Sequence, residues 1–194
     1  MGSSISVLFL LSAAAMTGPA SIPAPSTSGV YLTAEDHANG ALTDAGSCQA
    51  SFKVALHDVL NRPFIDVSRG AEKKQYAKSE LFGVRLCDGH DYRFSANRLH
   101  RILATGDLYI YVVERPVSQG KGFRLVPSYY FSSGARGEVR PLTLEHLQEA
   151  FATNHRFIDS LDRLSDQDLA QYDGYHQQFK IARLLAESTT IATR

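Results

Sequence analysis

The sequence predicts an α+β fold in which an antiparallel β-sheet is followed by C-terminal helices packed on it. Between residues 51 and 140, apolar residues recur at about every second position or in short continuous runs, which is typical of strands. After Pro141 they recur at helical spacing instead. Strands followed by helices favour the α+β class. The 194 residues, 44% of them hydrophobic, suffice for one domain with its own core.

The N-terminal segment is typical of a signal peptide. Ile5–Met16 is an apolar run of the length of a signal-peptide core, and it is short for a membrane span. Small residues follow, with candidate cleavage positions after Ala15, Ala20 and Ala24. No Lys or Arg precedes the run, so a buried N-terminal helix is the alternative, and Met1–Ser6 also fits a myristoylation pattern. We expect an exported protein, periplasmic or extracellular.

The rest of the chain predicts one folded unit. We expect residues 1–24 to hold the signal peptide and the start of a linker, 25–28 the linker, 29–188 a single α+β domain and 189–194 a frayed tail. Pro19–Ser28 is uncharged and rich in Pro, Ser and Ala, as linkers are. No later segment is long and apolar enough to cross a bilayer, so we expect no membrane span in the mature chain.

The two cysteines, Cys48 and Cys87, predict one disulfide. An exported chain meets an oxidising compartment, where such a pair can be bridged. The bridge would close a loop of about 40 residues and stabilise the fold by about 4 kcal/mol. Two separate buried thiols are the alternative. The chain has no C-x-x-C spacing that would indicate zinc.

The first elements are a short helix and two strands. Thr33–Asp36 has the pattern of a helix N-terminus, with Thr33 as the cap and a helix over Ala34–Asn39. Ser51–Val59 alternates in part, and Pro63–Val67 is a short apolar run with Pro at its start, where strands tolerate it. We expect Gly70–Lys74 to form a polar turn between strands.

The central strands predict a hairpin and a buried pair. Phe82, Val84 and Leu86 alternate on one face, and Tyr92 and Phe94 continue that face beyond a polar tip.

The next two strands are longer. Asp107–Glu114 is apolar on both faces and reads as a central strand, and Phe123–Ser132 is another strand. Pro127 within it predicts an edge or a bulge. Gly134–Gly137 turns the chain toward Glu138–Arg140.

The C-terminal part predicts three helices. The first is capped by Thr143 and ends at Asn154, and the second carries the Phe157–Leu164 apolar stripe. Ser165–Asp168 resembles a capping box for a third helix, in which Leu169 to Ala182 recur at helical spacing. The segment Leu184–Ser188 is expected to be a fraying helix end, with an interaction face as the alternative.

Two loops carry the candidate functional residues. The first contains Asp88, His90 and Asp91, but Asp-Gly between alternating runs is a strong hairpin signal, so we interpret it as a turn with an exposed tip. A metal or acid–base site there would need a distant His57 or His100.

The second loop, with Ser118 and Lys121, resembles a phosphate-binding loop only faintly. It lacks the glycine spacing of that motif, so we interpret it as a mobile connection between strands and a candidate binding loop. No metal, cofactor or catalytic motif is predicted anywhere in the chain.

The charge balance limits the classes of partner. Lys plus Arg and Asp plus Glu are both 20, which gives no net charge. A dedicated nucleic-acid binder usually has a basic excess, so we expect no nucleic-acid partner. The same balance disfavours binding of anionic lipid by overall charge alone, although a local patch remains open.

Several short motifs resemble a group of uncharacterised exported bacterial proteins. They are KSELFG, CDG, YRF, PVSQGKG, YYFS and PLT followed by AF, between Lys78 and Phe151. The similarity extends over roughly Gly29 to Leu185. It implies export and a single folded unit, and it assigns no activity, substrate or catalytic residue.

These observations favour an exported, non-enzymatic binding or scaffold module of the cell envelope or the secreted fraction. The partner is unknown, and an envelope protein or self-association through an edge strand near Pro127 are the two options. The alternative is a secreted hydrolase or metal-dependent enzyme that uses the loop of Asp88, His90 and Asp91.

Overall fold

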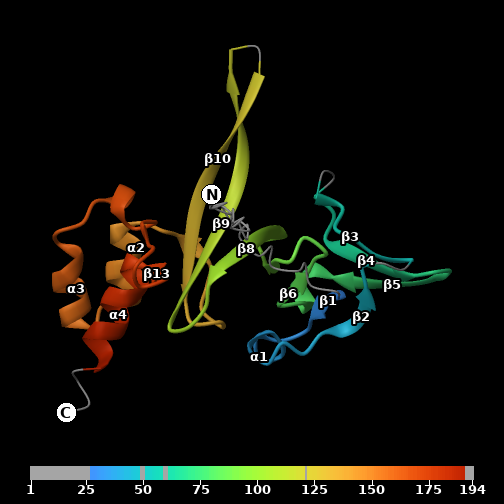
Figure 1. Ribbon diagram of the computed structural model, residues 1–194, viewed down its shortest axis with the longest axis horizontal. Helices are drawn as coiled ribbons and strands as arrows, with labels where there is room; N and C mark the ends of the chain where they lie inside the picture. The colour runs from blue at the N-terminus through green and yellow to red at the C-terminus, as the bar shows by residue number, and fades with distance from the viewer. Residues whose placement is uncertain (1–26, 49–50, 59–60, 121, 191–194) are drawn as a thin grey trace, which may run out of the picture.

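The computed structural model describes residues 27–48, 51–58, 61–120 and 122–190 (Figure 1). It consists mostly of antiparallel β-sheet with a few helices, so the fold is α+β or mainly β. The predicted leader lies outside these residues, as does most of the predicted tail. The first strand begins at Thr27, so residues 27 and 28 belong to the sheet and not to the expected linker.

Eight strands form the main sheet, in the order β11-β10-β9-β8-β7-β6-β1-β2, and every neighbouring pair is antiparallel. The strands are β1 (Thr27–Tyr31), β2 (Thr43–Ser47), β6 (Gly83–Arg85), β7 (Asp91–Ser95), β8 (Arg98–Ala104), β9 (Leu108–Gln119), β10 (Gly122–Ser133) and β11 (Arg140–Pro141). Among the described residues, no strand pairs with the outer side of β10 at Pro127, in agreement with the predicted edge.

A second sheet has three strands in the order β3-β4-β5: β3 (Phe52–Ala55), β4 (Phe64–Arg69) and β5 (Glu72–Ala77). The expected turn over Gly70–Lys74 was wrong, because β5 begins at Glu72 and only two residues make the turn. Glu72–Gln75 are all exposed, so this strand has no apolar alternation to reveal it. Ile65 and Val67 of β4 are buried with Val30, Val84 and Phe94 of the main sheet.

Four α-helices are described: α1 (Ala34–Ala38), α2 (Leu144–Ala150), α3 (His155–Leu161) and α4 (Lys180–Thr190). Two 3-10 turns, η2 (Lys78–Glu80) and η3 (Asp166–Asp168), accompany them. The predicted caps are confirmed at Thr33, which forms a complete capping box with Asp36, and at Thr143, whose side chain accepts a hydrogen bond from the backbone of His146.

The C-terminal helices differ from the prediction in three places. Asn154 does not end α2 but caps α3, accepting a hydrogen bond from the backbone of Phe157. Much of the predicted third helix is instead a small hairpin of β12 (Tyr172–Asp173) and β13 (Gln178–Phe179). Its turn is held by Asp173, which accepts hydrogen bonds from two backbone N–H groups. The 184–188 segment is not a frayed end, because Leu185 and Ser188 are buried in α4.

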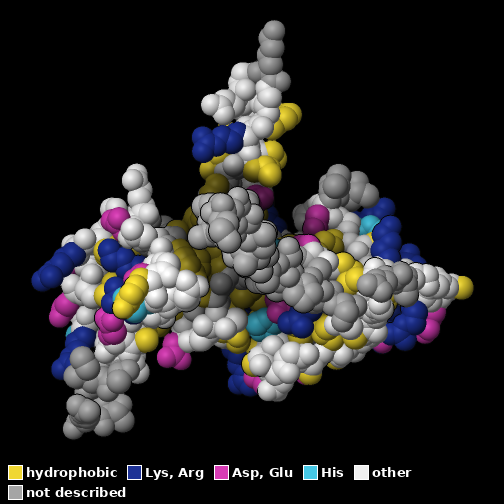
Figure 2. Space-filling model, viewed as in Figure 1, with side chains coloured by type: hydrophobic (Ala, Val, Ile, Leu, Met, Phe, Trp, Pro, Cys, Tyr) yellow, Lys and Arg dark blue, Asp and Glu magenta, His cyan; other side chains and the backbone are white. Residues whose placement is uncertain are grey.

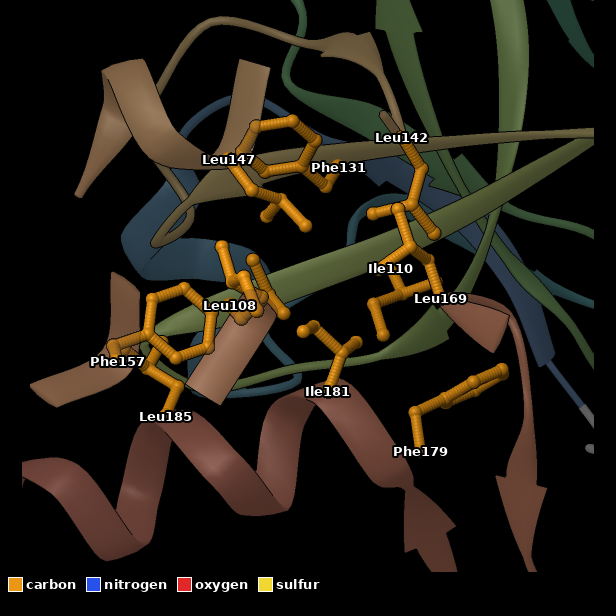
Figure 3. Close-up of a cluster of buried hydrophobic side chains, with 11 residues drawn as sticks. Leu108, Ile110, Phe131, Leu142, Leu147, Phe157, Leu169, Phe179, Ile181 and Leu185 are labelled. Carbon is orange, nitrogen blue, oxygen red and sulfur yellow. The ribbon is translucent and has the colours of Figure 1, made fainter. Parts of the chain in front are cut away.

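The largest buried cluster joins β9 and β10 to the C-terminal elements (Figure 3). Leu108 and Ile110 of β9 and Phe131 of β10 supply the strand side. Its remaining members are Leu142, Leu147, Phe157, Leu161, Leu169, Phe179, Ile181 and Leu185. Tyr109 and Tyr111 alternate with those strand residues and belong to a separate cluster with Tyr31 and Phe82.

The predicted disulfide between Cys48 and Cys87 is confirmed, with the two Cα atoms 5.7 Å apart. It connects the residue after β2 to the loop between β6 and β7. Because β1 lies between β2 and β6, the bridge fastens one end of a three-strand unit.

The β9–β10 pair extends beyond the rest of the sheet, as Figure 1 shows. The two strands pair over their full length, from Leu108 with Ser133 to Gln119 with Gly122. On the other side of β9, pairing with β8 ends at Val112. We call residues 113–119 and 122–128 the distal ribbon. Within the described part of the chain, these two segments pair only with each other.

Candidate functional site

The 88–91 loop forms a hairpin turn, as predicted, but the Asp88–Gly89 pair is not its centre. The Gly89 N–H donates to the carbonyl of Leu86, so Cys87 and Asp88 are the central residues. Among these, only Gly89 has a positive φ, 89°. A type I′ or II′ turn centred on Asp88 and Gly89 would need a positive φ at Asp88. Gly89 is therefore the fourth residue of the turn, after its two central residues.

The three candidate side chains of this loop do not meet at one point. Asp88 is exposed and accepts hydrogen bonds from the His90 backbone and from the Tyr92 hydroxyl, 2.5 Å away. His90 is exposed as well. Asp91 turns inward and lies against other residues. The predicted exposed tip therefore holds for Asp88 and His90 and was wrong for Asp91.

Asp91 is the centre of a half-buried polar cluster. Arg85 donates two hydrogen bonds to its carboxylate, at 2.7 and 2.8 Å, and the Tyr31 hydroxyl donates a third at 3.2 Å. His37 Nε2 lies 3.5 Å from the other side. Burial alone would raise the pKa of Asp91, but the hydrogen bonds from His37 and Arg85 outweigh burial and lower it. This carboxylate is held ionised as a structural partner.

The distant histidines proposed for an acid–base site lie elsewhere. His57 Nε2 is 2.7 Å from Asp66 in the three-stranded sheet. His100 is buried against Tyr130 on the main sheet. The histidine that does reach the loop is His37, which the sequence analysis did not select. Over residues 27–48, 51–58, 61–120 and 122–190, no group of three or more His, Cys, Asp or Glu could hold a metal ion.

The second predicted loop sits at the end of the distal ribbon. Ser118 is exposed in β9, opposite Phe123 of β10. Lys121 lies outside the described residues. The 88–91 loop leads into β7, and this second loop joins β9 to β10. A groove lies over β7, β8 and β9, between the two loops.

A groove of about 950 Å³ lies on one face of the main sheet. Tyr92, Arg101 and Val112 are cross-strand neighbours on β7, β8 and β9, so they form its floor together with Leu99. On the same face, Val84 and Phe94 belong to a buried cluster with Ile65 and Val67 of the three-stranded sheet, and Leu108 and Ile110 belong to the cluster that also contains residues of α2, α3 and α4. The groove lies between these two clusters.

The walls of the groove come from separated segments. Asp58 and Asn61 flank it from the connection between β3 and β4, and Asn97 from the turn between β7 and β8. Residues 113–116 line it from the side, where β9 no longer has β8 beside it. Both predicted loops are therefore neighbours of the groove: Tyr92 on its floor donates to Asp88, and the distal ribbon begins at its wall.

Three arginines contribute to the lining of the groove: Arg98, Arg101 and Arg115. Alternation along the strands puts Arg101 on the floor with Tyr92 and Val112, whereas Arg98 and Arg115 start from the opposite face at the edge of the groove. None of the three is in an ion pair within the described part of the chain; Arg115 donates instead to the hydroxyl of Tyr130. The Nε atom of Arg101 is buried and has no hydrogen-bond acceptor among these residues. A buried donor without an acceptor is unfavourable, so this atom marks where an acceptor is missing.

Two carboxylates also line the groove, and they do not neutralise it. Asp58 is already paired with Lys78, whose ammonium is 2.9 Å away and almost fully buried. Glu114 is exposed at the base of the distal ribbon. The pKa of Tyr92 is raised, first by burial and then by its hydrogen bond to Asp88, so its hydroxyl stays protonated as a donor. The groove carries an excess of positive charge beside the apolar side chains of Leu99 and Val112.

No motif or spacing in the sequence points to these arginines. Arg98 and Arg101 lie three residues apart in one strand, which the sequence shows only as a basic, partly apolar stretch. Alternation could have placed Leu99 and Arg101 on one face, beside Tyr92. What the sequence does not show is that this strip lies between the two buried clusters.

Within the described residues, no helix reaches the length and apolar character needed to cross a bilayer. Comparison with protein families, curated proteins and solved structures gives no match for this chain.

Proposed function

We propose that the protein is an exported, non-enzymatic binding module and that its binding site is the arginine-lined groove. The observation that carries the proposal is Arg101, whose buried Nε faces no acceptor while Arg98 and Arg115 line the same groove without ion pairs. The intramolecular disulfide supports a non-cytoplasmic location.

The ligand class follows from the lining. Guanidinium groups remain protonated in proteins and present planar donors that match carboxylate or phosphate oxygens. Leu99, Val112 and Pro116 offer apolar surface next to them. We infer that the ligand combines an anionic group with an apolar or aromatic part.

Arginine also supports binding over catalysis. A general acid or base must exchange its proton near neutral pH, and guanidinium groups do not. The loop of Asp88, His90 and Asp91, the alternative enzyme site, has its acids engaged by Tyr92 and Arg85. On this proposal the C-terminal helices are a fixed cover packed on the sheet, which the shared cluster around Ile110 and Phe131 supports.

Calorimetric titration with 1-naphthoate tests the proposal, with the neutral alcohol 1-naphthalenemethanol as the matched probe. We expect naphthoate to bind and the alcohol to bind much more weakly. Arg101→Gln should weaken naphthoate binding by about tenfold or more, because a hydrogen bond to a charged group contributes roughly 1.5–3 kcal/mol.

Arg163→Gln, an exposed arginine outside the groove, is the control and should bind as the original chain does. Thermal melting shows whether each variant is folded. If Arg101→Gln does not fold, Arg98→Gln provides the second test of the groove. Equal binding of the charged and neutral probes, or full affinity in both groove variants, would contradict the proposal.

A further inference from the structure

The distal ribbon exposes large apolar side chains. Phe123 is 81% exposed, Leu125 59% and Val117 48%. They occur where the β9–β10 pair has left the sheet, so no other described element covers them. A soluble protein rarely gathers such side chains on one projection without a partner surface.

The ribbon has two different faces. Phe123 and Leu125 are two residues apart and lie on one face, where Leu125 is opposite Pro116 and the face continues to Pro127. Arg124 and Arg115 lie on the other face, beside Val117. Figure 2 shows the basic and the hydrophobic side chains on opposite sides of this projection. Its end therefore combines apolar surface with cations on long, flexible stems.

The prolines disfavour docking by strand pairing. Pro116 in β9 and Pro127 in β10 have no N–H to offer, so an added strand would lose a hydrogen bond on either edge. A second copy packed face to face is also disfavoured. A ribbon of seven residues per strand covers on the order of 250 Å² per copy from its strand dimensions, well below the roughly 1,000 Å² in total of a stable interface.

We propose that the distal ribbon docks the protein on an anionic phospholipid surface. Phe123 and Leu125 enter the headgroup region, as amphipathic segments at membranes do, while Arg124 extends toward lipid phosphates. The net charge of the whole chain is zero, so the attraction is local to this ribbon. The inference goes beyond the proposed groove function and does not depend on it.

A tryptophan reporter tests the docking directly. The chain contains no Trp, so Phe123→Trp gives a single emission that reports its own surroundings. We expect this emission to shift to shorter wavelength with vesicles of phosphatidylglycerol and phosphatidylcholine, and to be quenched by brominated lipid in them. Vesicles of phosphatidylcholine alone should give a much smaller shift.

The matched control is Tyr175→Trp, at an aromatic residue that is 89% exposed on the C-terminal hairpin. Its emission should not change with either vesicle. This local comparison is needed because the apolar segment at residues 5–16 could bring any full-length chain to a vesicle. Adding Arg124→Gln to the Phe123→Trp chain should weaken the lipid dependence roughly fivefold, the effect of one cation near an anionic surface.

The inference is overturned if the Phe123 and Leu125 positions, each replaced by Trp in turn, show no shift with anionic vesicles. It is also overturned if the Tyr175 reporter shifts as much as they do. Naphthoate titration of the same proteins reports the groove separately, so failure of one proposal is distinguishable from failure of the other.

Discussion

Two carboxylates show how single residues stabilise this fold. Asp66 is buried in the three-stranded sheet and accepts hydrogen bonds from His57, Lys73 and Gln75. The hydrogen bond from His57 is the main cause that lowers the pKa of Asp66 to about 2. Asp91 is held ionised in a similar way. Neither group is poised for proton transfer at neutral pH, which favours a structural role.

The lowered pKa of Asp66 predicts the acid response. A carboxylate whose pKa is lower in the folded state contributes stability above its unfolded value, near 3.8, and loses it as pH falls toward about 2. The melting temperature should therefore fall between pH 4 and pH 2. Asp66→Asn should cost about 1–3 kcal/mol at neutral pH, because His57 and Lys73 lose their shared acceptor.

Thermal melting across that pH range checks both statements, with Asp159→Asn, an exposed residue of α3, as the control. Asp66→Asn should flatten the acid limb of the curve, and the control should keep it. An unchanged acid limb in Asp66→Asn would show that other groups govern acid unfolding.

Among the secondary-structure elements, the β6–β7 hairpin depends on a single residue, Gly89. Its φ of 89° is easily reached by glycine and strained for an L-residue with a Cβ. Gly89→Ala should therefore lower the stability by about 1 kcal/mol, roughly 2–4 °C in melting temperature. Gly174→Ala, where a Cβ meets nothing within 4 Å and φ is not positive, should lose little. Equal melting of the two variants would argue against a strained position at 89.

Local signals predicted the elements well where one residue decides the local geometry. The caps at Thr33 and Thr143 and the hairpin at Gly89 depend on side-chain or backbone chemistry within a few residues. β5 was missed because its exposed, charged start has no period that could mark a strand. The β12–β13 hairpin was missed because Leu169, Tyr172 and Phe179 also fit a helical spacing. In both cases pairing with the neighbouring strand of a hairpin decided the outcome.

At the scale of the whole molecule, the groove lies between two buried clusters on one face of the sheet. One cluster contains Val84 and Phe94 with residues of the three-stranded sheet, and the other contains Ile110 and Phe131 with C-terminal residues. The strip through Tyr92 and Arg101 lies between them. No local pattern encodes this, since it depends on the extent of both clusters. The sequence therefore predicted antiparallel strands and the disulfide and could not predict the groove.

The same separation predicts that reduction of the disulfide acts on one half of the molecule. The Cys48–Cys87 bridge joins β2 to the loop after β6, beside the Val30 and Val84 cluster, and none of the cluster around Ile110 lies near it in the strand order. Removing it should cost about 2–5 kcal/mol.

Hydrogen exchange followed by mass spectrometry measures where that stability is lost. In the reduced protein, or in the Cys48→Ser and Cys87→Ser double variant, amides of β1, β2 and β6 should lose protection. Amides of β9, β10 and α4 should keep most of theirs, because their cluster has its own buried side chains. Uniform loss across both halves would mean that the two clusters unfold as one unit, with the strip between them transmitting the change. Unchanged exchange everywhere would mean that the bridge contributes nothing to the folded sheet.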